Sequence, residues 1–311
     1  MERGAIPIES CPGGMDLRLT LESGQSYLWR RDDDRMYDGA DGGWYHTVVD
    51  GTDPRSTGSP SESGELIRVR QRDDALEWES TTDAVPHLRR LLRLDDDLDA
   101  IVDATPADPL IDEAYAAHRG LRLVRDPPFP CLISFICSAQ MRVGRIHGMQ
   151  VTLAREFGDT LVVDGETYHA FPKPRQLAAA SVEELRGCSL GYRAPYVKET
   201  AEMVADGDRP EDALGTAYED ARERLTRFVG VGEKVADCVL LFSLGYLEAV
   251  PLDTWIRSAI EEHYPDCDRG SYRETSRAIR ERFGEYAGYA QTYVFHFLRT
   301  GGSVPETHEN S

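Results

Sequence analysis

Hydrophobic residues change their spacing near residue 84, and this change divides the chain into two parts. Before that point, apolar and polar positions alternate in short runs between turns rich in Asp, Gly and Ser, as in antiparallel strands. We predict strands in MDLRLTL, YLWR, GWYHTVV, ELIRVRQ and ALEWEST, which are residues 15–21, 27–30, 43–49, 65–71 and 75–81. The polar segment DGTDPRSTGSPSESGE at 50–65 is predicted to be a loop.

From residue 85 onward, apolar residues recur at helical spacing. We predict helices in 85–94, 98–105, 110–118, 131–140, 145–158, 181–188, 191–207, 218–228, 233–244, 253–264, 271–283 and 285–299, and a loop in GETYHAFPKP at 165–174. The fold class is therefore α+β, with an N-terminal antiparallel β-sheet domain at 1–84 and an all-helical body at 85–300. The remaining segment, 301–311, is predicted to be a disordered tail.

A glycine turn joins two of these helices, giving a helix-hairpin-helix at 218–244. Gly230 and Gly232 flank Val231 directly before the helix that starts near Glu233. Glycines permit tight turns and a close approach of the backbone, and a helix N-terminus offers free N–H groups to a phosphate. The motif predicts a contact with a nucleic-acid backbone, although such a glycine string is weak without its neighbours.

Lys234 lies in the first turn of the second helix and is one of only three lysines in the chain. A lysine can lose its proton and attack carbon to form a Schiff base, which an arginine cannot do. Asp253, at the start of a later helix, is positioned as an N-cap and can also stabilise a developing cation. The alternatives are a solvated surface lysine and a carboxylate that only caps its helix.

Composition limits the setting in which this chemistry takes place. The 311 residues carry a net charge of −20, and 41% of them are hydrophobic, without a run of membrane-spanning length or a signal-peptide pattern. The six cysteines form no CxxC pair, which argues against a zinc site, a disulfide framework and an iron–sulfur cluster. We therefore expect a cytoplasmic protein, and we interpret its acidity as adaptation to a salt-rich, halophilic cytoplasm.

The string GVGEKVADC, with VPLD ending nineteen residues after the lysine, resembles the helix-hairpin-helix DNA glycosylases. Within them it is similar to the eukaryotic-type 8-oxoguanine DNA glycosylase/AP lyases. The resemblance implies that Lys234 attacks the sugar and that Asp253 stabilises positive charge there. It also implies that the hairpin, with Gly230 and Gly232, grips the DNA backbone and can hold a monovalent cation on its carbonyls.

Four further segments match this family between Leu17 and Phe297. The resemblance assigns Gly24, Cys238, Gln291 and Phe295 to the base pocket, with the Gly24 carbonyl accepting the N7–H that 8-oxoguanine has and guanine lacks. It assigns Gln140, Arg145, Tyr192 and Arg193 to the DNA and the estranged cytosine. Each of these residues has a structural explanation as well, in a turn, a helix terminus, a surface tyrosine or a core aromatic.

Two positions depart from the family pattern. Gln140, Met141 and Arg142 replace three asparagines, which puts the preference for cytosine opposite the lesion in doubt. Trp255 replaces a histidine that contacts a DNA phosphate, and an indole N–H donates a hydrogen bond without carrying charge.

The resemblance predicts a base-excision repair enzyme. We expect a monomer that removes 8-oxoguanine from double-stranded DNA through a lysine Schiff base and nicks the strand by β-elimination. No cofactor, catalytic metal or membrane is expected to take part. The alternatives are a monofunctional Asp253-dependent glycosylase for alkylated bases, and a DNA-binding module without catalysis.

Overall fold

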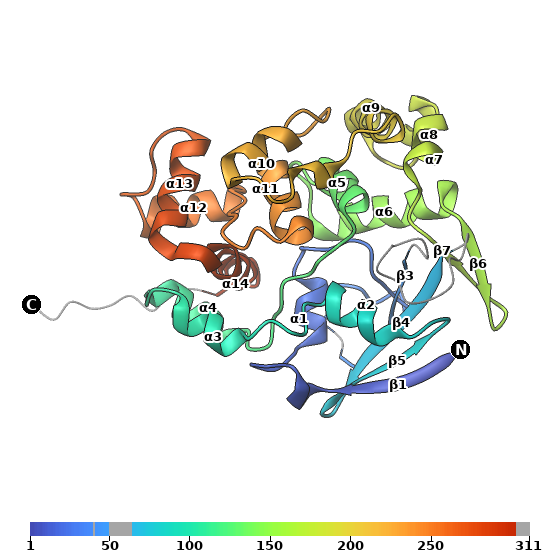
Figure 1. The fold of residues 1–311 in the computed structure, drawn as a ribbon, viewed down its shortest axis with the longest axis horizontal. Coiled ribbons are helices and arrows are strands. Elements are labelled where there is room, and N and C mark those ends of the chain that lie inside the picture. The colour runs from blue at the N-terminus through green and yellow to red at the C-terminus, as the bar shows by residue number, and fades with distance from the viewer. Residues whose placement is uncertain (40, 50–63, 303–311) are drawn as a thin grey trace, which may run out of the picture.

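A computed structural model describes residues 1–39, 41–49 and 64–302 of the chain. The predicted loop at 50–65 and the predicted tail at 301–311 lie almost entirely outside these residues. Figure 1 shows an N-terminal sheet and a larger helical part stacked against it, which confirms the predicted α+β class. Within the described ranges, no helix is long and apolar enough to cross a membrane.

The N-terminal sheet is antiparallel and has five strands in the order β1-β5-β4-β3-β2. Its strands are β1 (Glu2–Pro7), β2 (Arg30–Arg31), β3 (Tyr45–Val49), β4 (Glu65–Arg72) and β5 (Ala75–Ser80). The predicted strands at 43–49, 65–71 and 75–81 are confirmed, because their apolar residues alternate and fill one face of the sheet. On the other face, Arg70 of β4 pairs with the carboxylate of Glu77 of β5 at 2.6 Å.

The strand predicted at 15–21 is wrong, because this segment forms helix α1 (Leu17–Glu22). Asp16 caps the helix by accepting a hydrogen bond from the Leu19 N–H at 2.8 Å. Leu17 and Leu21, four residues apart, are buried in the sheet-domain core. Of the strand predicted at 27–30, only Arg30 lies in a strand, as the first residue of β2. Strand β1 was not predicted, because Ile6 is its only buried residue and it shows no alternation of apolar and polar positions.

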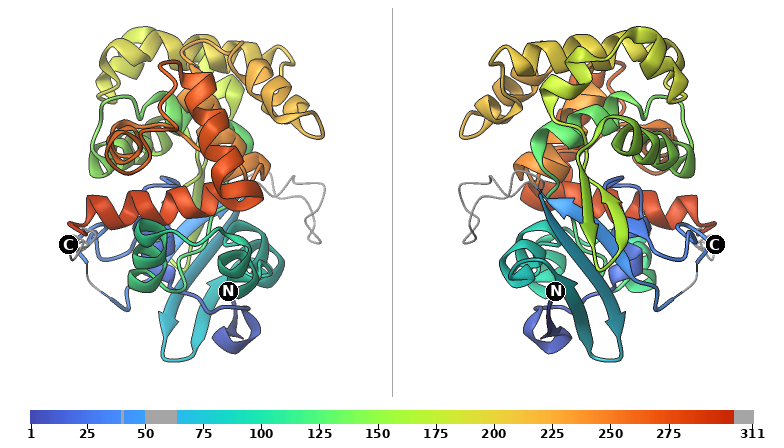
Figure 2. Two further views of the ribbon diagram at one scale, coloured as in Figure 1. Left: turned by 90° about the vertical axis from the view of Figure 1, so that its left-hand side faces the viewer. Right: turned by 90° about the vertical axis from the view of Figure 1, so that its right-hand side faces the viewer.

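The helical part contains α2 to α14. Their bounds are α2 (Ala84–Leu91), α3 (Leu98–Ala104), α4 (Pro109–Ala117), α5 (Pro128–Ile136), α6 (Val143–Phe157), α7 (Pro174–Ala179), α8 (Val182–Gly187), α9 (Ala194–Ala205), α10 (Tyr218–Leu225), α11 (Glu233–Val239), α12 (Thr254–His263), α13 (Tyr272–Phe283) and α14 (Ala287–Arg299). The predicted helices are confirmed within a few residues of their ends, and α11 continues as a π-helical turn over Leu240–Leu244. In Figure 2, α14 lies between the upper helices and α4, and its Tyr293 packs edge-on against Tyr115 of α4.

The body is not all-helical as predicted. Residues 165–174 were expected to be a loop, but β6 (Thr160–Val163) and β7 (Glu166–His169) form an antiparallel hairpin. Asp164 and Gly165 make its two-residue turn, both with positive φ (51° and 87°). An Asp-Gly pair is a strong sequence signal for a hairpin. It was overlooked because the hydrophobic residues before it recur at helical spacing.

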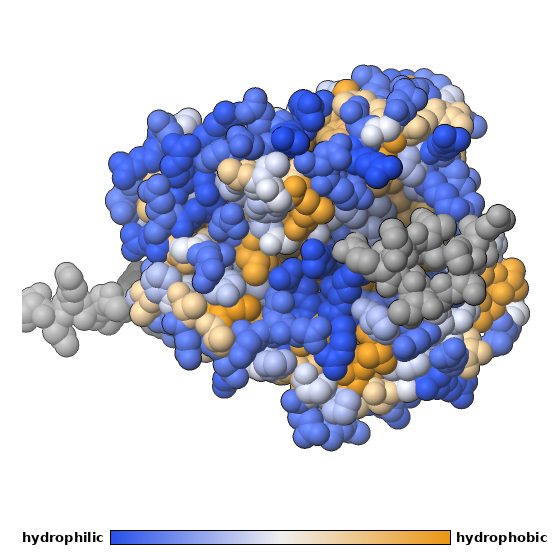
Figure 3. All heavy atoms as spheres, in the orientation of Figure 1, coloured by the Kyte–Doolittle hydropathy of each residue, from blue (hydrophilic) through white to orange (hydrophobic). Residues whose placement is uncertain are grey.

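The two parts of the chain are joined by buried polar side chains. The Arg122 guanidinium is fully buried and donates to the Gly14, Pro12, Arg93 and Asp96 carbonyls. The Gln25 side chain donates to the Arg122 carbonyl at 2.7 Å and accepts from the Val124 N–H at 2.9 Å. The turn at residues 23–26 is thereby fixed against the helical part. In contrast to this interior, the face in Figure 3 is covered mainly by hydrophilic residues.

Candidate active site

A cavity of about 750 Å³ opens between the two parts of the chain. Its walls come from the 23–27 turn, the end of α5 and the start of α6, α11, the 251–257 segment and α14. The cavity brings together many of the residues singled out from the sequence, namely Gly24, Gln140, Lys234, Cys238, Asp253, Gln291 and Phe295. These residues span most of the chain, so the fold places them in one site that no single segment could form.

Lys234 is half-buried near the start of α11. Its ammonium donates to the Ser138 hydroxyl at 3.0 Å and lies 5.4 Å from the centre of the Phe135 ring. Ser138, just past the end of α5, was not among the predicted site residues. The sequence feature that could have indicated it is its position, since Ser138 is the first hydroxyl after the apolar run that ends in Cys137.

Asp253 is the N-cap of α12, as predicted, and accepts a hydrogen bond from the Ile256 N–H at 2.9 Å. Burial raises the pKa of this carboxyl, while the Ile256 N–H and the charge of Lys234 oppose the increase. No ion pair joins Asp253 to Lys234, although both line the cavity. The two functional groups therefore face one space without neutralising each other.

The far end of the cavity combines a glycine, an aromatic ring and an amide. Gly24 has a φ of +96°, and a Cβ there would lie 3.1 Å from Val143 and 3.6 Å from the Phe295 ring. Gln291 lies one helical turn before Phe295 on α14, and its Oε1 atom is buried without a hydrogen-bond partner in the described chain. Burial raises the pKa of Cys238 to about 12, so its thiol is protonated and acts as a packing group.

The residues predicted to read DNA are only partly brought to the cavity. Gln140 lines it, in a left-handed conformation with a φ of +55°. Arg145 is exposed and lies outside the cavity lining, as do Tyr192 and Arg193. Tyr192 is 58% exposed, whereas Arg193 is buried, donates to the Ala139 carbonyl and lies 4.3 Å from the centre of the Tyr192 ring.

The predicted glycine hairpin connects α10 to α11. Gly230 has a φ of +79°, and a Cβ there would lie 2.7 Å from the Cβ of Tyr196 on α9. Gly232, in contrast, has a φ of −89° and serves as the N-cap of α11. Apart from its chain neighbours, no atom of the described residues lies within 4 Å of a Cβ built on Gly232, so this position leaves room for an approaching backbone.

A buried polar network behind Lys234 was missed from the sequence. Asp237, one turn further along α11, is fully buried and accepts hydrogen bonds from the hydroxyls of Tyr218 (2.6 Å) and Tyr272 (2.8 Å). Its carboxylate lies 3.6 Å from the Arg222 guanidinium, and the Tyr272 hydroxyl also accepts from the Leu252 N–H at 3.1 Å. The network ties the helix of Lys234 to the loop that leads into Asp253. A carboxylate inside the apolar run VADCVLLF was the available signal.

In the ranges that the structure describes, no three His, Cys, Asp or Glu side chains are placed to hold a metal ion. The hairpin carbonyl of Val229 accepts the Thr200 hydroxyl at 2.8 Å, and that of Phe228 accepts the Val231 N–H at 3.1 Å. The cavity itself is lined by an amine, a carboxylate, an amide and aromatic rings.

Comparison with known proteins gives two adjacent family matches. Residues 8–132 match the 8-oxoguanine DNA glycosylase N-terminal domain, and residues 133–285 match the HhH-GPD superfamily of base excision DNA repair proteins. The chain is 30% identical over 313 aligned positions to an N-glycosylase/DNA lyase of Arabidopsis thaliana, covering 93% of this chain and 79% of the relative.

Two further relatives agree with these matches. A protein of Methanothermobacter thermautotrophicus named "Probable N-glycosylase/DNA lyase" is 36% identical over 206 residues, which are 60% of this chain and 66% of that relative. The 8-oxoguanine glycosylase/lyase of Clostridium acetobutylicum, solved with double-stranded DNA containing cytosine opposite 8-oxoguanine, superposes with a TM-score of 0.78. It is 26% identical in sequence, and the match covers 92% of each chain.

Proposed function

This chain belongs to the N-glycosylase/DNA lyase family of base excision repair proteins, and on that premise we propose that it excises 8-oxoguanine from duplex DNA and nicks the strand. The observation that carries the proposal is the placement of Lys234 and Asp253 in one cavity without an ion pair between them. An amine paired to a carboxylate would be held protonated, whereas a nucleophile must lose its proton. The cavity of about 750 Å³ is large enough to admit a flipped base.

The reaction begins when the Lys234 amine, having lost its proton, attacks C1′ of the damaged nucleotide. The bond from C1′ to the base breaks, and the base leaves with the bonding electrons and gains a proton. Positive charge develops at the sugar in this step, and the Asp253 carboxylate at the N-terminus of α12 stabilises it. Opening of the sugar ring gives a Schiff base on Lys234, which permits β-elimination of the 3′ phosphate.

We assign the far end of the cavity to base recognition. Phe295 offers a ring for stacking, and the partnerless Oε1 atom of Gln291 offers an acceptor for the Watson–Crick edge of a purine. The Gly24 carbonyl is assigned to the N7–H of 8-oxoguanine. An acceptor left without a donor would disfavour guanine by about 1–3 kcal/mol, because a buried polar group without a partner is costly.

One residue of the cavity lining, Gln140, and three residues outside the cavity are assigned to the DNA duplex. The exposed Tyr192 fills the gap left by the flipped nucleotide, and Gln140, Arg145 and Arg193 face the estranged base. For Arg193 this role requires release of its hydrogen bond to the Ala139 carbonyl. We further propose that the enzyme works as a monomer in a salt-rich cytoplasm, where screening weakens the repulsion between DNA and a chain of net charge −20.

The experiment uses high salt, a duplex with one 8-oxoguanine opposite cytosine, and borohydride to reduce a Schiff base. The wild-type chain should form a covalent adduct with the DNA, and Lys234→Gln should form none. Lys198→Gln is the matched control, because Lys198 donates to the Ala178 and Ala180 carbonyls and lies outside the cavity lining. Base release without an adduct would instead indicate a glycosylase that depends on Asp253 alone, and DNA binding without base release would indicate a binding module.

A further inference from the structure

Tyr37, between β2 and β3, has a backbone conformation that tyrosine rarely adopts. Its φ is +70°, and in the described chain it is the only aromatic residue with a positive φ. A bulky side chain at positive φ is energetically unfavourable and persists only where the surrounding structure enforces it. Tyr37 also lines the candidate active-site cavity. A strained residue at this place points to a functional constraint, because such strain is found mainly at active sites and ligand contacts.

Glu22, the last residue of α1, holds Tyr37 from inside the sheet domain. Its carboxylate is buried, accepts the Tyr37 N–H at 3.0 Å and the Tyr45 hydroxyl at 2.7 Å, and lies 3.4 Å from the Arg31 guanidinium. The ring of Tyr37 meets the His147 ring edge-on, with their centres 5.6 Å apart. The tyrosine is therefore fixed at its backbone and at its ring, whereas its hydroxyl takes part in none of these contacts.

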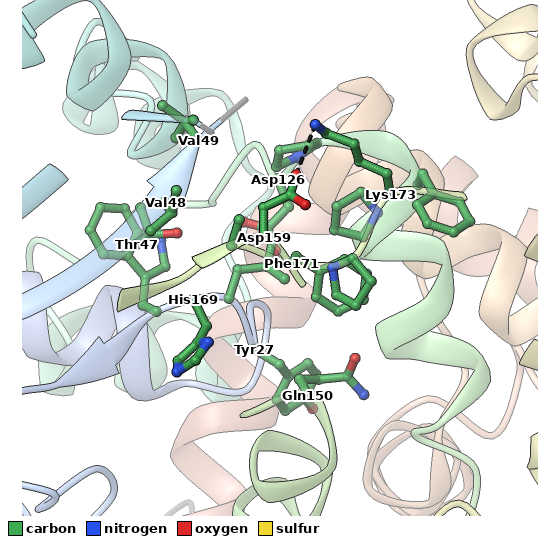
Figure 4. Close-up of a pocket in the computed structure, with 18 of the residues that line it drawn as sticks. Tyr27, Thr47, Val48, Val49, Asp126, Gln150, Asp159, His169, Phe171 and Lys173 are labelled. Atoms are coloured by element: carbon green, nitrogen blue, oxygen red, sulfur yellow. Dashed lines mark ion pairs between the residues drawn. The ribbon is translucent and has the colours of Figure 1, made fainter. Parts of the chain in front are cut away.

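The Tyr37 hydroxyl is buried and has no hydrogen-bond partner among the described residues. Burial raises the pKa of this hydroxyl, and the charge of Glu22 adds to the increase, so the group can donate a proton at neutral pH. A buried donor without an acceptor costs free energy that a partner would recover. A second cavity, of about 250 Å³, shares Tyr27 with the active-site cavity, but Tyr37 does not line it (Figure 4). A ligand that supplies the acceptor must therefore enter the active-site cavity.

Tyr37 lies beside the glycine that is assigned to the lesion. A Cβ built on Gly24 would lie 3.1 Å from Val143, and a Cβ built on Gly144 would lie 4.0 Å from the Tyr37 ring. Gly24 and Tyr37 thus flank the same two residues at the start of α6. In 8-oxoguanine the C8 carbonyl adjoins the N7–H on the ring, so a carbonyl acceptor beside a hydroxyl donor matches this pair of groups. The Watson–Crick edge is already assigned to Gln291.

We propose that the Tyr37 hydroxyl donates a hydrogen bond to the C8 carbonyl oxygen of the flipped 8-oxoguanine. This inference rests on the proposed function, because it adds a contact to the base that the cavity is proposed to hold. Guanine carries a hydrogen at C8, so the hydroxyl would stay without a partner when the undamaged base enters. The cavity then reads both polar groups that distinguish the lesion, the N7–H through Gly24 and the oxygen through Tyr37.

The test compares two substrates in single turnovers. One is a duplex with 8-oxoguanine opposite cytosine, and the other is the same duplex with a preformed abasic site. Tyr37→Phe removes only the hydroxyl and should slow base excision about tenfold, as expected for the loss of one hydrogen bond. Nicking at the abasic site should keep the wild-type rate, because that substrate has no base to contact. The melting temperature should not fall, because the lost hydroxyl has no partner in the free protein.

Binding to an inactive variant measures recognition without catalysis. In Lys234→Gln, the dissociation constants for a guanine duplex and for the matching 8-oxoguanine duplex give a ratio that reports discrimination. Adding Tyr37→Phe should lower this ratio about tenfold. Tyr168→Phe is the control, because it removes a tyrosine hydroxyl on β7, outside the lining of the active-site cavity. The control should leave the ratio unchanged.

The outcomes separate this inference from the proposed function. If the wild-type chain acts on both substrates and Tyr37→Phe matches its excision rate and its binding ratio, the contact to the C8 oxygen is overturned. Equal losses on both substrates, with a lower melting temperature, would also overturn it and would show that Tyr37 supports only the fold. If the wild-type chain acts on neither substrate, the proposed function fails, and the inference fails with it.

Discussion

The Lys234 ammonium donates to the Ser138 hydroxyl at 3.0 Å and makes no ion pair with Asp253. Ser138 thus holds the amine in place through a neutral hydroxyl. We expect Ser138→Ala to lower the single-turnover rate of base excision about tenfold, because the amine loses its fixed position. Ser134→Ala is the control, since the Ser134 hydroxyl is buried on α5, the helix that ends just before Ser138, and has no hydrogen-bond partner among the described residues. Equal effects of the two substitutions would contradict this role.

Asp253 has two functions that substitution can separate. Asparagine caps helices as well as aspartate does but carries no charge. Asp253→Asn should therefore keep the melting temperature and lower the excision rate by about 10²–10³-fold, the loss typical of a group that stabilises transition-state charge. Asp253→Ala should also cost about 1 kcal/mol of stability, because the cap is lost. An active Asp253→Asn variant would remove the carboxylate from the mechanism.

The network around Asp237 allows a matched pair of tyrosine substitutions. Tyr218 and Tyr272 each donate to Asp237. We therefore expect Tyr218→Phe and Tyr272→Phe each to lower the free energy of unfolding by about 1–3 kcal/mol. Only the Tyr272 hydroxyl also accepts from the Leu252 N–H, next to Asp253. The excision rate should therefore fall in Tyr272→Phe alone, as measured in single turnovers well below both melting temperatures. Equal rates in the two variants would show that the network serves folding only.

The two hairpin glycines should respond differently to alanine. Gly230→Ala forces a positive φ on a side chain and brings its Cβ against Tyr196, so we expect a loss of about 1–3 kcal/mol in the free energy of unfolding. Gly232→Ala meets neither obstacle and should change stability by less than about 1 kcal/mol. Denaturant unfolding measures the free energy of unfolding of both variants. A Gly230→Ala protein as stable as the wild type would contradict this expectation and would show that Tyr196 on α9 can move away from the added Cβ.

The buried carboxyl of Asp126 should make stability depend on pH. Burial raises its folded pKa to about 7, above the unfolded value of about 4, so the folded state holds this proton more tightly. The resulting stabilisation is complete below about pH 4 and is lost as the pH rises through about 7, by an amount on the order of 2–4 kcal/mol. In urea unfolding across this range, Asp126→Asn should show a flatter profile. A variant with the wild-type slope would assign the proton to another group.

Hydrophobic spacing predicted most of the helices and the long strands, because those elements bury one clear face. It failed at residues 15–21, where Leu17 and Leu21 share a face in a strand and in a helix alike. Only the cap formed by Asp16 distinguishes the two, and it is a single residue. The β6–β7 hairpin was lost for a similar reason, since its four-residue strands are shorter than the helical pattern around them.

The site could be predicted where one motif fixes the local geometry, as with Lys234 in its helix turn and Asp253 at its N-cap. It could not be predicted where partners are distant in sequence. Arg193 is held by a hydrogen bond to the Ala139 carbonyl, 54 residues away in the sequence. The hydrogen-bond network of Asp237 includes Tyr272, which is 35 residues away. No local pattern records such pairings, because the fold as a whole determines which side chains meet.

Tyr196 touches Gly230 on one side and the ring of Tyr192 on the other, with the two tyrosine ring centres 6.3 Å apart. The hairpin and the exposed Tyr192 therefore both pack against Tyr196, in the first turn of α9. Given their proposed roles, seating of the phosphate backbone fixes the height at which Tyr192 meets the base stack. With the depth of Tyr192 fixed in this way, the free energy needed to unstack a given base pair determines whether Tyr192 can insert there.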